Sequence, residues 1–147
     1  DNLMSRLLVA ALLIAQVIAV EASDSPAIEA MQEYLDFADY ADGTISSEQI
    51  NSVGPDSFYF VDTRNASQYK AGHIPGAINI EWREVLSRRD EIPGDKPVVL
   101  YCDTGLLSPR AHFALRVAGR DNIKLLWGGY VAWSASQSLE AVQQQQQ

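Results

Sequence analysis

The sequence predicts an α/β fold, a mainly parallel sheet with helices on both of its faces. Short apolar runs rich in β-branched and aromatic residues alternate with helical patterns along the chain, and strands that are apolar throughout are typical of a parallel sheet covered on both sides. No hairpin signal separates successive strands, so each connection is expected to cross back over the sheet. The expected strands are 44–45, 58–62, 77–80, 98–101 and 123–127.

Length and composition are those of one ordinary globular domain. The chain has 147 residues, of which 47% are hydrophobic and 20% are charged, which suffices for a single sizeable core. Its formal net charge is −8, which argues against nucleic acid and anionic membrane surfaces as partners. Any site for an anion must therefore be built locally, from backbone dipoles and a few arginines.

The N-terminal segment is predicted to be a targeting signal. Arg6 is followed by an apolar run from Leu7 to Val20, and Val20-Glu21-Ala22 fits a small-x-small cleavage site before Ser23. That run has 14 residues, which is short for a membrane-spanning helix of about 20. Residues 4–22 are thus expected to be a signal peptide, with an uncleaved N-terminal anchor as the alternative, and only that anchor would bring contact with a membrane. Residues 1–3 precede Met4, the expected initiator, and are interpreted as a cloning remnant.

The rest of the chain divides into three parts. Residues 23–42 are predicted to form a helical extension, 43–138 the main domain, and 139–147 a glutamine-rich tail without order. Export to a bacterial periplasm is expected, which would place the only cysteine in an oxidising compartment.

Within the main domain, four segments are expected to be helical or to begin helices. Ser46 and Gln49 suit a helix start, and 66–70 reads as a short helix. Residues 82–89 are amphipathic, with Trp82, Val85 and Leu86 expected inward. The glycine turn at 128–129 should begin a last helix.

The stretch from Val98 to Gly119 holds the most specific pattern. A buried strand, 98–101, leads into Cys102; Ser108 is expected to cap the next helix with Pro109 as its first residue, and Gly119 to end it. Cys102 therefore lies at the carboxyl end of a strand and close to a helix N-terminus, where open α/β folds place their ligands.

The loop around Cys102 suits the binding of an anion. Its backbone N–H groups can converge on one point, and the dipole of the following helix adds to their field. The anion could be the Cys102 thiolate or an oxyanion beside it; a buried, inert cysteine is the alternative interpretation. A lone cysteine cannot form an intramolecular disulfide. The loop residues concerned are Asp103, Thr104, Gly105, Leu106, Leu107 and Ser108.

Several motifs together resemble the rhodanese-domain family. They cover about residues 43 to 136, in the order and spacing of the family. They are Ile45-Ser46 with Glu48-Gln49, Val61-Asp62-Thr63-Arg64, Gln68-Tyr69, the run from Gly72 to Ile80, Tyr101-Cys102 with Gly105 and Ser108, and Trp127-Gly128-Gly129-Tyr130 with Ala132-Trp133.

This resemblance implies a rhodanese-like five-stranded parallel sheet with helices on both faces, and a sulfurtransferase that needs no cofactor. Cys102 would take a sulfane sulfur from thiosulfate or a persulfide, and pass it to a thiol or cyanide-like acceptor. Related phosphatases have a longer loop closed by an arginine, which is not present here. A non-enzymatic sulfur carrier, or a module that docks a protein partner, is the alternative function.

The interior of the loop departs from many thiosulfate-using members, because it lacks Arg and Lys. Asp103 should raise the cost of the thiolate, and the two leucines bring no charge. Arg110 could compensate by folding back, or could simply face solvent. Weak thiosulfate activity, or an apolar or protein-borne persulfide donor, is therefore a possibility.

The remaining polar candidates have structural explanations. Asp62 and Arg64 are expected to bond each other and to scaffold the site, His73 to make a structural hydrogen bond, and His112 to be exposed or half-buried. Two histidines and one cysteine, widely spaced, suggest no metal site. Trp127, Tyr130 and Trp133 are expected to pack around the glycine turn.

Overall fold

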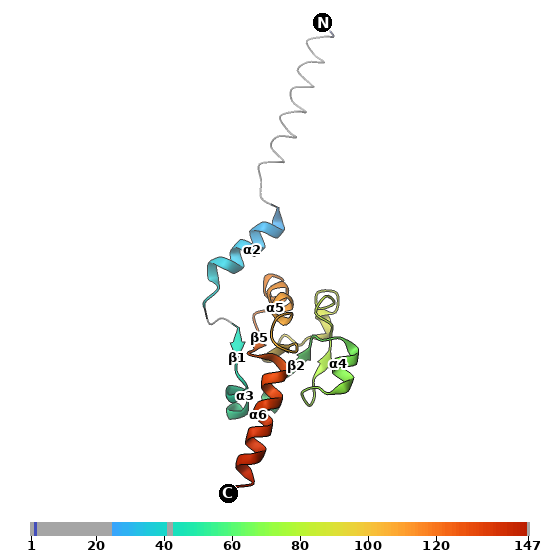
Figure 1. Ribbon diagram of the computed structural model, residues 1–147. Coiled ribbons are helices and arrows are strands. Elements are labelled where there is room, and N and C mark those ends of the chain that lie inside the picture. The colour runs from blue at the N-terminus through green and yellow to red at the C-terminus, as the bar shows by residue number, and fades with distance from the viewer. Residues whose placement is uncertain (1, 3–24, 41–42, 147) are drawn as a thin grey trace. The chain divides into compact units, whose positions relative to one another are not determined.

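The computed structural model describes residues 2, 25–40 and 43–146 (Figure 1). Its contacts divide the chain into two compact units, Asp1–Phe37 and Ala38–Gln147. Helix α2 (Pro26–Phe37) belongs to the first unit and buries none of its residues. The predicted signal segment, 4–22, lies outside the described residues. None of the helices within the described ranges is both long enough and apolar enough to cross a membrane.

The second unit is built on a five-stranded parallel sheet, which confirms the predicted fold class. The strand order is β1-β5-β4-β2-β3, and every neighbouring pair is parallel. The strands are β1 (Thr44–Ile45), β2 (Tyr59–Asp62), β3 (Ile78–Asn79), β4 (Val98–Tyr101) and β5 (Ile123–Leu126). Strand β4 is the middle strand of this order and is buried along its whole length. The residues that follow it therefore start from the centre of the sheet.

Alternate residues of the central strands feed two separate clusters of core residues. On β4, Val99 and Tyr101 point into a cluster that includes Ile50 and Trp133, while Val98 and Leu100 point into the other. This is the two-residue period of a strand that is covered on both faces. The helices are α3 (Ser47–Val53), α4 (Ala66–Ala71), α5 (Ser108–Val117) and α6 (Gly129–Gln144), with two 3₁₀ turns at Pro55–Ser57 and Arg89–Glu91.

Local capping explains where two of the helices begin. Ser46 caps α3, its side chain accepting from the Gln49 amide while Gln49 bonds back to the Ser46 amide. Asn65 and Gln68 form the same capping box at α4. The predicted helix start at Ser46 is confirmed.

The predicted disorder of residues 139–147 is wrong for most of the segment, because α6 continues to Gln144. Glutamine is a good helix former. The last turns also contact α3, since Asn51 Nδ2 donates a hydrogen bond of 2.5 Å to Glu140 Oε1. Gln137 also donates to the Asn51 side chain. A tertiary contact that composition does not reveal therefore orders this part of the chain.

Two further expectations about element ends are corrected. Residues 82–88 form successive turns rather than a helix, and Leu86 is 43% exposed while Val85 is buried. Strand β5 ends at Leu126, and Trp127 beyond it is 72% exposed instead of packed. Amphipathic periodicity overestimated the covered face in the first case, and the length of an apolar run did so in the second.

Candidate active site

The loop after β4 wraps around the sulfur of Cys102. Three backbone amides donate hydrogen bonds to Sγ, from Gly105 at 3.3 Å and from Leu107 and Ser108 at 3.4 Å each. The Ser108 hydroxyl lies 3.3 Å from the same atom and donates as well. Three N–H groups form the cradle that the loop pattern predicts, and the hydroxyl adds a fourth donor to the same sulfur.

These donors lower the pKa of Cys102. Burial by itself raises the pKa of the thiol, but the hydrogen bonds from Ser108, Leu107 and Gly105 outweigh it, and the net pKa lies below the ordinary thiol value. The thiolate, which is the nucleophilic form of cysteine, is thus favoured. Its position at the start of α5 adds the helix dipole to the same effect.

Ser108 does not cap α5, contrary to the sequence prediction. It is the first residue of the helix, Leu107 occupies the N-cap position without a side-chain cap bond, and Pro109 stands second. From this position its hydroxyl donates to the Cys102 sulfur. At the other end, Gly119 follows the C-cap, Ala118, with φ +88°.

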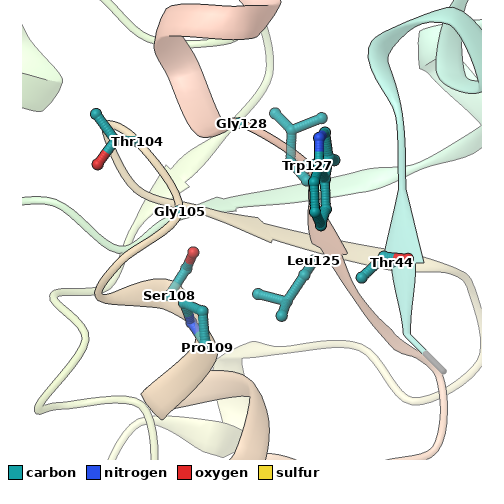
Figure 2. Close-up of a pocket in the computed structure, with 9 residues that line it drawn as sticks. Thr44, Thr104, Gly105, Ser108, Pro109, Leu125, Trp127 and Gly128 are labelled. Carbon is teal, nitrogen blue, oxygen red and sulfur yellow. The ribbon is translucent and has the colours of Figure 1, made fainter. Parts of the chain in front are cut away.

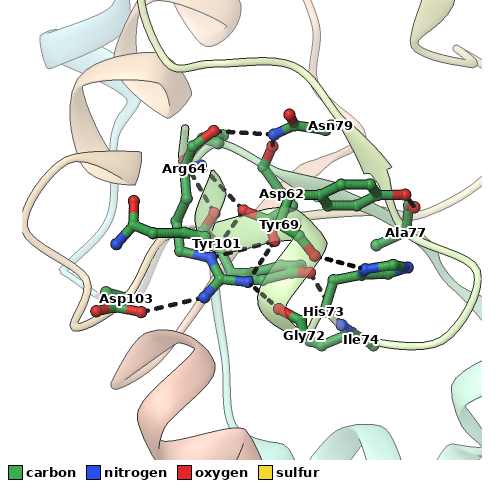
Figure 3. Close-up of polar contacts among 12 residues, drawn as sticks. Asp62, Arg64, Tyr69, Gly72, His73, Ile74, Ala77, Asn79, Tyr101 and Asp103 are labelled. Carbon is green, nitrogen blue, oxygen red and sulfur yellow. Dashed lines mark hydrogen bonds and ion pairs between the residues drawn. The ribbon is translucent and has the colours of Figure 1, made fainter. Parts of the chain in front are cut away.

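A buried ion-pair network supports the loop from the side of β2 (Figure 3). Arg64 Nη2 lies 2.7 Å from Asp62 Oδ2 and donates to the Gly72 carbonyl at 2.6 Å. Arg64 Nη1 lies 3.2 Å from Asp103 Oδ1, and its guanidinium is 4.2 Å from the centre of the Tyr130 ring. The predicted pairing of Asp62 with Arg64 is present in the structure.

This network changes the expected effect of Asp103. Its carboxylate is engaged by Arg64, so the charge next to Cys102 is partly compensated. Burial lowers the pKa of the Arg64 guanidinium, but Asp62 and Asp103 together raise that pKa above its usual value. Arg64 therefore stays charged, and the cost that Asp103 imposes on the thiolate is smaller than the sequence indicates.

The start of α6 closes the site from a third side. The Tyr130 amide donates to the Cys102 carbonyl at 2.8 Å, and the Val131 amide donates to the Asp103 carbonyl at 3.1 Å. A Cβ on Gly129 would lie 2.6 Å from both carbonyl oxygens. The glycine turn is thus required for α6 to approach the nucleophile loop.

Access to the sulfur is through a cavity of about 410 Å³, here called the mouth. It combines side chains from the end of β2, from the segment after β3 and from the Cys102 loop. The lining residues are Thr63, Arg64, Asn65, Gln68, Glu81, Trp82, Arg83, Cys102, Asp103, Thr104, Leu106 and Leu107.

A second cavity, of about 320 Å³, lies on the β5 side of the same loop (Figure 2). Cys102 does not line it, although Thr104, Gly105 and Ser108 do, and the exposed Trp127 forms one wall. Of these two cavities, the mouth is the one that Cys102 lines.

The other predicted site residues lie outside the mouth. His73 Nδ1 is 2.9 Å from the Tyr69 carbonyl, and its ring stacks on that of Tyr69. Arg110 does not fold back to the sulfur; its guanidinium lies 5.3 Å from the centre of the Trp82 ring. Over the residues that the structure describes, no group of three or more His, Cys, Asp or Glu side chains could hold a metal ion.

The expectation for His112 is wrong, since its side chain is buried, with Nε2 3.2 Å from the Ile123 carbonyl. Sequence reasoning also missed Glu81, Trp82 and Arg83 as parts of the site. Their position just after an expected strand was the available signal, because the carboxyl ends of parallel strands meet at one edge of the sheet.

Comparison with known proteins agrees with this geometry. The profile of the rhodanese-like domain matches residues 38–136, so the chain belongs to the rhodanese-like domain family. The uncharacterized protein YqhL of Bacillus subtilis (strain 168) is 37% identical over 90 residues, covering 61% of this chain and 71% of that protein. A sulfurtransferase of Allochromatium vinosum is 32% identical over 92 residues, covering 61% of this chain and 86% of that protein.

Among solved structures, a rhodanese-related protein from Thermoplasma volcanium superimposes with a TM-score of 0.60 at 23% identity. The match covers 64% of this chain and 92% of that one. At this identity the likeness shows the fold, a rhodanese-like α/β domain.

Proposed function

We propose that this protein is a sulfurtransferase that carries a sulfane sulfur on Cys102, from a donor such as thiosulfate to a nucleophilic acceptor. Membership of the rhodanese-like family and similarity to a sulfurtransferase support the class of reaction. The observation that carries the proposal is the set of four donors around the sulfur of Cys102, a residue that lines the mouth.

In the first step the Cys102 thiolate attacks the outer sulfur of the donor. With thiosulfate, the bond between the two donor sulfurs breaks, sulfite leaves with its electron pair, and Cys102 becomes a persulfide anion. Charge balances, because a thiolate and a dianion give a persulfide anion and a dianion. The amides of Gly105, Leu107 and Ser108 stabilise the charge on sulfur without reorganising.

In the second step an acceptor attacks the outer sulfur of the Cys102 persulfide. A thiolate acceptor leaves as a persulfide, cyanide leaves as thiocyanate, and the Cys102 thiolate is regenerated. Neither step involves an external oxidant or reductant.

The test is thiosulfate-to-cyanide transfer by the purified chain, with intact-mass measurement and Cys102→Ser as the control. We expect turnover in the wild type only, with one added sulfur atom on the chain after treatment with donor. Absence of both the added sulfur and the turnover, in a folded protein, would overturn the proposal.

A sulfur carrier, or a module that docks a protein partner, is the second candidate function. The exposure of Leu106, 77%, next to the nucleophile favours it, since an exposed apolar side chain at a reactive centre suits a macromolecular contact. A stable persulfide on Cys102 that cyanide does not discharge would support the carrier over the enzyme.

We also propose that the chain is exported to the periplasm of a bacterium. The apolar run from Leu7 to Val20, after Arg6 and before small residues, supports this. The test is expression of the full chain in a bacterial host, followed by fractionation and N-terminal sequencing. We expect a periplasmic product that begins near Ser23, and retention in the cytoplasm for Leu13→Glu; a full-length product in the membrane fraction would indicate the anchor instead.

A further inference from the structure

We infer that the mouth selects sulfur donors that carry an apolar substituent and at most one negative charge, and that Leu107 and the Glu81–Arg83 pair determine this preference. The inference rests on the proposed function and names the class of its donor. It comes from the charges and the apolar surface that surround Cys102.

The cations that line the mouth are both paired with carboxylates. Arg64 is held by Asp62 and Asp103, and Arg83 lies 3.0 Å from Glu81. The ionised side chains lining the cavity, apart from Cys102, are two guanidiniums and two carboxylates. The mouth thus has no net positive charge with which to attract a dianion against the charge of the whole chain, −8.

The mouth also presents apolar surface to an incoming molecule. Trp82, Leu106 and Leu107 all line the mouth, and Leu106 is 77% and Leu107 37% exposed. A cavity of about 410 Å³ is within the range that small molecules occupy. An apolar substituent would be removed from water here, which is favourable.

Arg110 does not add a positive charge to the lining of the mouth. Its guanidinium lies 5.3 Å from the centre of the Trp82 ring, and Arg83 lies 5.7 Å from the same ring. The ring stabilises such a guanidinium without removing its charge, but Arg110 is not among the residues that line the cavity.

Thiosulfate is a dianionic donor without an apolar group, and benzenethiosulfonate is a monoanionic donor with one. Both react with Cys102 by the same chemistry. The Cys102 thiolate attacks the outer sulfur of either one, the bond to the oxidised sulfur breaks, and sulfite or benzenesulfinate leaves with the electron pair. Charge balances in both reactions. The dianion must lose part of its hydration without an unpaired cation to replace it, whereas the monoanion brings a ring that the mouth can cover.

The experiment measures the ratio of kcat/KM for benzenethiosulfonate to kcat/KM for thiosulfate, with cyanide as acceptor. Because sulfinate and sulfite differ as leaving groups, the change of this ratio between variants is the readout. Leu107→Arg adds a cation to the mouth, and Glu81→Gln frees Arg83. We expect the ratio to fall about tenfold in Leu107→Arg and about threefold in Glu81→Gln, with both changes shrinking at high salt.

Leu139→Arg is the matched control, since it places the same exposed substitution on α6, away from the mouth. Its ratio should equal that of the wild type. A ratio that stays constant in both mouth variants, or a wild type with a lower KM for thiosulfate than for benzenethiosulfonate, would overturn the inference while leaving the sulfurtransferase intact. Failure of Cys102 to take sulfur from either donor would overturn the proposed function, and the inference with it.

Discussion

At the scale of single residues, Ser108 is the only side chain within the described residues that hydrogen-bonds the Cys102 sulfur; the other donors are backbone amides. The reactivity of Cys102 can therefore be altered by substitution at one side chain without changing the loop backbone. Arg64 is a second side chain on which the site depends, because its guanidinium bonds Asp62, Asp103 and the Gly72 carbonyl.

We predict that Ser108→Ala raises the pKa of Cys102. Loss of one hydrogen bond to the thiolate, worth about 1 kcal/mol, corresponds to a rise of roughly half to one pH unit. The rate of alkylation by iodoacetamide, followed against pH, measures this at a single site because the chain has one cysteine. The rate falls as the pH falls through the pKa, so the variant should lose reactivity at a higher pH than the wild type.

Ser138→Ala is the control for this profile, since the Ser138 hydroxyl donates to the Ser134 carbonyl on the exposed side of α6. Its alkylation profile should match that of the wild type. An unchanged midpoint in Ser108→Ala would contradict the assignment of the hydroxyl as a donor to the thiolate.

We predict that Arg64→Ala lowers the free energy of unfolding by about 3–5 kcal/mol, because it leaves a fully buried Asp62 without its ion-pair partner. Urea denaturation measures this. Arg88→Ala removes an arginine whose partners, Glu84 and Glu91, are on the surface, and should cost at most about 1 kcal/mol. Similar losses in the two variants would show that the buried network is not a special support of the site.

At the scale of elements, the site is the meeting point of β4, the N-terminus of α5 and the N-terminus of α6. The first two follow one another in the chain, whereas α6 reaches the loop through the amides of Tyr130 and Val131. The close approach of α6 depends on Gly129, which has φ +63° and no room for a Cβ.

We predict that Gly129→Ala both destabilises the domain and slows sulfur uptake by Cys102, because the new Cβ would push α6 away from the nucleophile loop. Gly119→Ala is the matched control, since Gly119 also has a positive φ, +88°, but open space around it. The control should cost about 1 kcal/mol through backbone strain alone and leave uptake unchanged. Equal stability losses and equal uptake rates in the two variants would contradict the role given to Gly129.

At the scale of the whole molecule, the thiolate of Cys102 links the site to global stability. The hydrogen bonds that lower its pKa in the folded state are lost on unfolding, where the pKa returns to about 8.5. A depressed pKa stabilises the folded state above the unfolded value, and this contribution is lost as the pH falls through the folded value.

We predict that the free energy of unfolding of the wild type rises, relative to that of Cys102→Ser, as the pH increases from the folded pKa of Cys102 to about 8.5, and then levels off. Urea denaturation of both proteins at several pH values measures the difference. A difference that is constant with pH would show that the sulfur has the same pKa in both states, and that the cradle does not stabilise the thiolate.

The sequence by itself determined the fold class, the order of the strands along the chain and the position of Cys102 at the end of β4. These follow from local properties: apolar runs, helix starts such as Ser46, and a glycine-containing loop before a helix. Such signals act over a few residues, so they can be read from the chain directly.

Only the tertiary structure decided which side chains surround the sulfur. Ser108 donates to Cys102 from the first position of α5, Arg64 partly compensates the charge of Asp103, and Trp82 lines the mouth. Each of these contacts depends on how segments distant in sequence are placed next to one another, or on how the folded loop directs a side chain toward the sulfur. Local propensity carries no information about either, because the energy of such a contact exists only when both partners have been brought together.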